Sequence, residues 1–117
     1  MAALESFRLI VSAAWADGSL DESEKAYLYK AAHELGIKAS EVPSLILEVQ
    51  EGRATARVPK NPAERAKVFR TLVDLVAADG SVDEGELAFF RKLAPRFGLH
   101  ELELEDILRA SGAKLPK

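Results

Sequence analysis

Six carboxylates in two groups have the only spacing in this chain that suggests a chemical site. The first group is Asp17, Asp21 and Glu24, and the second group is Asp79, Asp83 and Glu86. Each group places its carboxylates at positions i, i+4 and i+7, so the oxygens can converge where one helix turns into the next. Hard divalent cations such as Ca²⁺, Mg²⁺ or Mn²⁺ take several oxygen ligands. Each group is therefore a candidate metal site.

The same residues also have local structural explanations. Asp21 fits a helix N-cap, and Glu24 stands where the second half of a capping box belongs; Asp83 and Glu86 repeat this pattern. Asp17 differs because it follows a helix C-terminus, where the backbone dipole disfavours a carboxylate. Either its side chain turns forward to cap the next helix, or a cation binds there. Both interpretations remain open from the residues alone.

Other kinds of site fit the sequence less well. An EF-hand loop ending at Glu24 would need oxygen ligands at Ala13 and Trp15, which are apolar. The chain has no cysteine, and His33 and His100 do not form a zinc motif, so thiolate and imidazole-rich sites are disfavoured. No phosphate loop or nucleophile elbow is present. We therefore expect a protein that is not an enzyme, and a small hydrolase using the carboxylates is disfavoured.

The two acidic groups belong to an internal repeat. Asp17-Gly18-Ser19 recurs as Asp79-Gly80-Ser81, 62 residues later. About fifteen of the forty-two residue pairs between 7–48 and 69–110 are identical at this offset. A repeat of this length must be recognised before any fold is assigned. We expect one domain over residues 1–117, with repeats at about 4–51 and 61–111 joined by a linker at 52–60.

Apolar residues recur at helical spacing throughout both repeats. The expected helices span about 3–15, 22–35, 40–51, 62–78, 84–97 and 101–111, and the tail after Gly112 is expected to fray. No segment alternates with the period of a strand. The predicted fold is all-α: a compact bundle of about six to seven helices, in which two three-helix repeats share one core around a pseudo-twofold axis.

Composition and charge limit the classes of partner that the chain is expected to bind. The net charge of −3 and the absence of stacking aromatics around the basic residues 53–70 argue against nucleic acid. No apolar run reaches the roughly 20 residues of a membrane span, and no secretory signal is apparent. We expect a cytoplasmic protein with a protein partner.

The motif Ala16-Asp17-Gly18-Ser19 with its copy at residues 78–81, followed by Leu35-Gly36-Ile37 and Phe97-Gly98-Leu99, resembles the TerB-like domain family. This family includes a bacterial tellurite-resistance protein and the N-terminal region of DnaJ-like membrane co-chaperones. The resemblance covers residues 4–108. It implies an all-helical pseudo-symmetric domain, a loose link to tellurite and other chemical stress, and a divalent cation held by Asp17, Asp21, Glu24, Asp79, Asp83 and Glu86.

Two functions follow as hypotheses. The first is a non-enzymatic TerB-like module that binds a divalent cation, Ca²⁺, Mg²⁺ or Mn²⁺, and acts in stress response. The alternative is a protein–protein interaction scaffold, or a co-chaperone-type docking domain, that needs no metal. In the alternative the carboxylates serve only helix capping and solubility. The partner then contacts either the acidic face or the surface around Trp15, whose repeat counterpart is Ala77.

Overall fold

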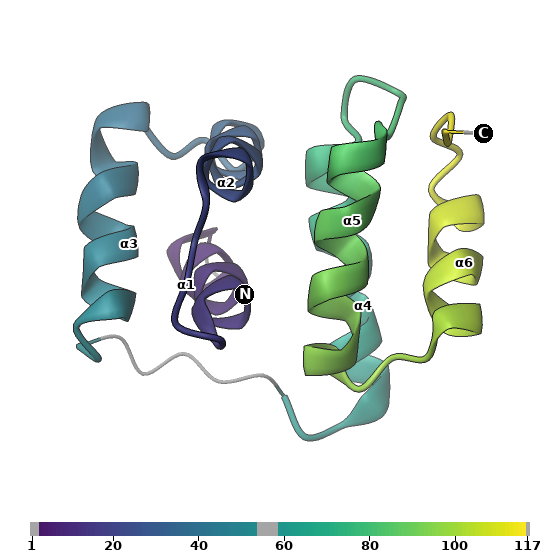
Figure 1. The fold of residues 1–117 in the computed structure, drawn as a ribbon, viewed down its shortest axis with the longest axis horizontal. Helices are drawn as coiled ribbons and strands as arrows, with labels where there is room; N and C mark the ends of the chain where they lie inside the picture. Colours follow the sequence, from purple (N-terminus) through teal and green to yellow (C-terminus); the bar gives the residue numbers. More distant parts are fainter. Residues whose placement is uncertain (1–2, 54–58, 117) are drawn as a thin grey trace. The chain divides into compact units, whose positions relative to one another are not determined.

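The described part of the chain is helical. The structure is a computed structural model that describes residues 3–53 and 59–116. These residues form six α-helices and two 3-10 helices without an extended strand (Figure 1). The predicted all-α class is confirmed. Arg57 of the basic stretch and most of the predicted linker lie outside the described residues.

The chain divides into two compact units, Met1–Val58 and Pro59–Lys117. The division falls inside the predicted linker at 52–60. The shared core and the pseudo-twofold axis expected from the repeat stay predictions. No helix of the described residues has both the length and the apolar character that a bilayer crossing demands.

The first unit contains α1 (Ala3–Trp15), α2 (Glu22–Glu34), the 3-10 helix η1 (Ala39–Glu41) and α3 (Val42–Gln50). Helix α1 contacts both α2 and α3 (Figure 1). Its apolar face follows the 3.6-residue period, so Phe7, Ile10 and Val11 are fully buried. A partly buried ion pair joins α1 to α3, in which Arg8 Nε donates to Glu48 at 3.0 Å.

The second unit contains α4 (Pro62–Val76), α5 (Glu84–Leu93), the 3-10 helix η2 (Ala94–Phe97) and α6 (Glu101–Ala110). Asn61 caps α4, as expected, by accepting from the N–H groups of Ala63 and Glu64 at 2.8 and 3.3 Å. Three fully buried phenylalanines form the centre of the unit. Phe69 lies edge-on to Phe90 and Phe97, with ring centroids 6.1 and 5.5 Å apart.

Two features differ from expectation. The fifth helix was expected to reach Phe97, but α5 ends at Leu93 because Pro95 has no N–H for an α-helical hydrogen bond; the chain continues as η2.

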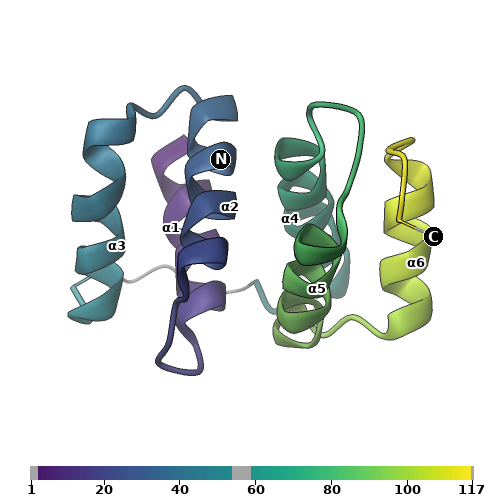
Figure 2. The same ribbon diagram turned by 45° about the horizontal axis from the view of Figure 1, so that its top comes forward.

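The tail was expected to fray, and this prediction was wrong for Lys114. Its backbone pairs with the turn between α4 and α5 as an isolated parallel bridge to Ser81. Figure 2 shows the yellow segment after α6 on the side of that helix that faces the α4–α5 loop.

Candidate functional site

The first corner, residues 15–24, joins α1 to α2. Gly18 adopts φ +80°, and its N–H donates to Trp15 O at 2.7 Å, which ends α1. Asp17 turns forward, as in one of the two interpretations, but its side chain bonds within the turn, and the cap of the next helix is Asp21. Asp17 Oδ1 accepts from the Ser19 N–H and the Ser19 hydroxyl, each at 3.1 Å. Asp17 therefore supports the turn itself.

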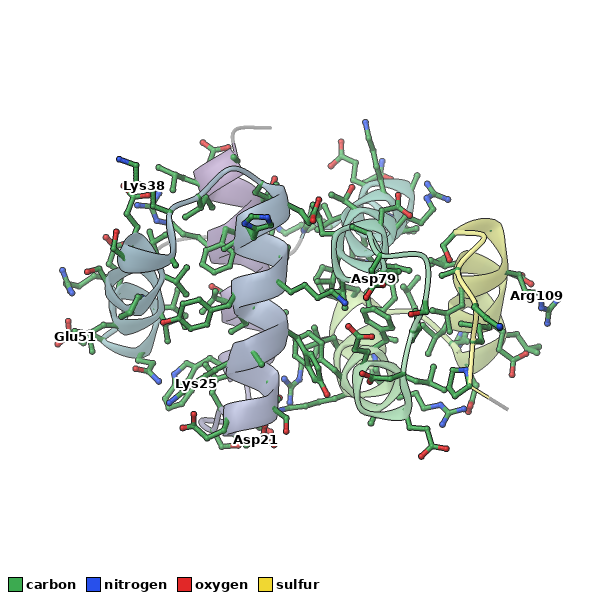
Figure 3. The ribbon with its side chains drawn as sticks, turned by 90° about the horizontal axis from the view of Figure 1, so that it is seen from above. Asp21, Lys25, Lys38, Glu51, Asp79 and Arg109 are labelled. Atoms are coloured by element: carbon green, nitrogen blue, oxygen red, sulfur yellow. The ribbon has the colours of Figure 1, made fainter. Side chains whose placement is uncertain are left out.

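Asp21 and Glu24 form the predicted capping box at the start of α2, and Figure 3 labels Asp21 at this end of the helix. Asp21 Oδ1 accepts from Glu24 N–H at 2.7 Å, and Glu24 Oε1 accepts from Asp21 N–H at 3.2 Å. Glu24 is only 7% exposed. A carboxylate is tolerated there because it meets main-chain N–H groups at the positive end of the helix dipole.

The second corner, residues 77–86, has the same local construction between α4 and α5. Gly80 adopts φ +89°, and Asp79 Oδ1 accepts from Ser81 N–H at 3.2 Å. Asp83 Oδ1 accepts from Glu86 N–H at 2.7 Å, and Glu86 Oε1 accepts from Asp83 N–H at 3.0 Å. Glu86 is 4% exposed. Both predicted capping boxes are confirmed.

The hydrogen bonds above give all six predicted ligands a role in local structure. In residues 3–53 and 59–116, no three or more His, Asp or Glu side chains gather in a way that could hold a metal ion. A cation at either corner would compete with main-chain N–H groups for the oxygens named above. Metal binding stays a prediction that a titration with divalent cations can test.

The capping boxes lead to a stability prediction. Asp21→Ala and Asp83→Ala are each expected to lower the free energy of unfolding by about 1 kcal/mol, because each leaves the N–H of the third helical residue without its acceptor. Urea denaturation followed by circular dichroism measures this. Asp21→Asn and Asp83→Asn are matched controls that keep an acceptor and should cost less. Equal losses from alanine and asparagine would contradict the capping role.

The corners differ in what covers their turn. At the second corner, Val82 N–H donates to Lys114 O at 2.8 Å, and Lys114 N–H donates to Gly80 O at 2.9 Å. Val82 is 3% exposed at this corner. At the first corner, Leu20 N–H and Gly18 C=O, the counterparts of these groups, have no hydrogen-bond partner anywhere in the described residues.

The apolar side chains of the corners follow the same difference. Leu20 is partly exposed, whereas its counterpart Val82 is buried. Trp15 is also partly exposed, whereas Ala77 is 8% exposed. The first corner therefore presents partly exposed apolar side chains next to several carboxylates and to two main-chain groups without a hydrogen-bond partner among the described residues. Sequence analysis found the Trp15 difference but missed the tail, for which the only local signal is the turn-forming Gly112 at φ +72°.

A shallow hollow in the second unit has no catalytic character. Its volume is about 210 Å³, and it is lined by Arg91, Ala94, Pro95, Leu99, Glu101 and Leu104. The two charged residues on its rim form an exposed ion pair, with Arg91 Nε 3.7 Å from Glu101 Oε1. The lining contains no nucleophile and no histidine, so the hollow suggests packing space between α5 and α6.

Comparison of the chain with protein-family models, curated proteins and solved structures gave no match. The resemblance to the TerB-like family therefore stays a prediction, resting on the duplicated Ala-Asp-Gly-Ser motif and the glycines at the end of the second helix of each repeat.

Proposed function

We propose that the chain is a non-enzymatic, TerB-like helical module that binds a partner protein through its first corner. The observation that supports this most is the difference between the corners. At the second corner the main-chain groups bond to the tail and Val82 is buried, whereas at the first corner Gly18 C=O and Leu20 N–H have no hydrogen-bond partner among the described residues, and Trp15 and Leu20 are partly exposed.

The physical argument concerns the hydrogen bonding of the main-chain groups at the first corner. Main-chain N–H and C=O groups are strong hydrogen-bonding groups that folded chains pair almost everywhere. Water satisfies those of the first corner in the free protein, and a partner's backbone can replace that water. A partly exposed tryptophan beside them adds a large apolar contact with a polar tip, the kind of side chain that often dominates binding energy.

Cross-linking from defined positions tests this proposal. Leu20 is replaced by the photoreactive residue benzoylphenylalanine in the full chain, and Leu47, which is 47% exposed in the same unit, is replaced in the matched control. We expect a discrete protein adduct from position 20 that disappears when Trp15→Ala is added. Adducts of equal yield from both positions, or none from position 20, would contradict the proposal.

Divalent-cation binding, which the resemblance implies, has less support from the geometry. Four of the six proposed ligands have an oxygen that caps a helix, and the other two have an oxygen that supports a turn. The link to tellurite or other chemical stress rests on the same resemblance.

A titration with Ca²⁺, Mg²⁺ and Mn²⁺ decides between the two functions. We expect no saturable heat in calorimetry and no change of melting temperature, because the carboxylates already accept main-chain N–H groups. The double variant Asp17→Asn/Asp79→Asn is the control. Saturable heat from the native chain that the double variant lacks would restore the metal hypothesis.

A further inference from the structure

The second corner shows how this kind of turn receives an extended segment. Lys114 lies beside Ser81 as in a parallel β-bridge: its C=O accepts from Val82 N–H, and its N–H donates to Gly80 C=O. The segment comes from the chain itself, directly after α6. The neighbours of Lys114 are the small residue Ala113 and the apolar residue Leu115, which is 37% exposed.

The first corner has the backbone conformation that makes this bridge, without the segment. Gly18 and Gly80 have φ values of +80° and +89°. The N-caps Asp21 and Asp83 have φ, ψ of −84°, 174° and −85°, 174°. Because the backbone angles match at both ends of turns of equal length, we expect Gly18 C=O and Leu20 N–H to present the same acceptor and donor pair that Lys114 meets at the second corner.

We propose that the first corner binds an extended segment of a partner protein by a parallel bridge, in which one partner residue accepts from Leu20 N–H and donates to Gly18 C=O. The inference rests on the proposed function and specifies its partner. Adding a strand to open main-chain groups is an established mode of peptide recognition, in which the backbone gives affinity and side-chain contacts give specificity.

The charged and apolar side chains around the first corner indicate which residue types the partner segment should contain. Asp17, Asp21 and Glu22 are exposed around the corner, and Lys25, which lies 3.7 Å from Glu22, is the one nearby cation in the first turns of α2. A basic residue in the segment is therefore attracted to the corner. The partly exposed Trp15 and Leu20 favour an apolar residue beside it. The expected segment is small–basic–apolar, as Ala113-Lys114-Leu115 is at the second corner.

A synthetic peptide with the sequence of residues 111–116, blocked at both ends, is the probe. It is titrated into the full, isotopically labelled chain, and backbone amide shifts are followed by NMR. We expect saturable shifts at Gly18, Ser19 and Leu20. N-methylation of the peptide lysine, which removes the N–H for Gly18 C=O, should weaken binding by about tenfold or more. N-methylation of the peptide leucine is the matched control and should change affinity little.

A protein variant gives an independent check. Leu20→Ser should weaken peptide binding by about tenfold, because it removes apolar surface without adding a charge that would attract the peptide lysine, and Leu47→Ser should leave peptide binding unchanged. The inference would be overturned by shifts confined to Gly80–Val82, by equal binding of the two methylated peptides, or by no binding of the peptide. Shifts at Leu20 that depend on protein concentration without peptide would also overturn it, in favour of a second copy.

The two proposals can fail separately. A cross-link from position 20 combined with an inactive peptide would reject the extended segment and keep the protein-binding function. Absence of both would reject the function itself.

Discussion

Phe69→Ala is expected to lower the free energy of unfolding by about 3–5 kcal/mol, the largest effect of any change considered for this chain. Phe69 is 0% exposed and lies edge-on to Phe90 and Phe97, which are also fully buried. Removal of the ring leaves a cavity between α4, α5 and η2 and removes two aromatic contacts. Urea denaturation followed by far-ultraviolet circular dichroism measures the loss.

Phe69→Leu is the matched control and should cost much less, because it keeps most of the apolar volume.

The same experiment tests the predicted shared core. Trp15 is the only tryptophan and belongs to the first unit, so its fluorescence follows the unfolding of that unit. If the repeats share a core, Phe69→Ala moves the fluorescence transition as far as the dichroism transition. Transitions that separate would contradict a shared core, and a loss below about 1 kcal/mol would contradict the packing described for Phe69.

Removal of residues 113–117 is expected to cost about 1–2 kcal/mol. The truncation leaves Val82 N–H and Gly80 C=O to water, which by itself changes little, and we expect it to expose part of Val82, which is 3% exposed in the full chain. Part of this loss is offset because the tail no longer has to be ordered. The midpoint of urea denaturation should fall without a large change in slope.

A double-mutant cycle with Val82→Ala gives the control. If the tail acts by covering Val82, the truncation should cost less in the Val82→Ala background than in the native one. Leu20→Ala, the counterpart at the first corner, should show no coupling with the truncation. A truncation that costs nothing, or that couples equally to both positions, would mean that the tail does not stabilise the second corner.

The helices could be predicted because their signals are local. Asp21 with Glu24, and Asp83 with Glu86, define helix starts by residue type and spacing, and the structure forms both capping boxes. Gly18 and Gly98 end helical segments at positive φ, where other residues are strained. The end of α5 was missed because Pro95 interrupts a segment whose apolar spacing continues to Phe97. Apolar period alone does not distinguish an α-helical turn from a 3-10 turn.

The candidate site could be located but not interpreted from the sequence. The duplicated motif points to both corners, and it indicates that they are alike. Their difference comes from Lys114, which is 33 residues beyond Ser81 and whose backbone, not its side chain, makes the contact. No residue type encodes such a main-chain bridge. Asp17 likewise had two interpretations from the sequence, and only the structure shows that its Oδ1 accepts hydrogen bonds from Ser19.

Amide hydrogen exchange of the full chain, resolved by residue, tests the central claim most directly. Val82 and Lys114 N–H groups, which are bonded across the second corner, should exchange at least about tenfold more slowly than the Leu20 N–H, which should approach the rate of an unstructured peptide. Equal protection of Leu20 and Val82 would contradict the account, because it would mean that the first corner is already closed or that the tail leaves the second corner open.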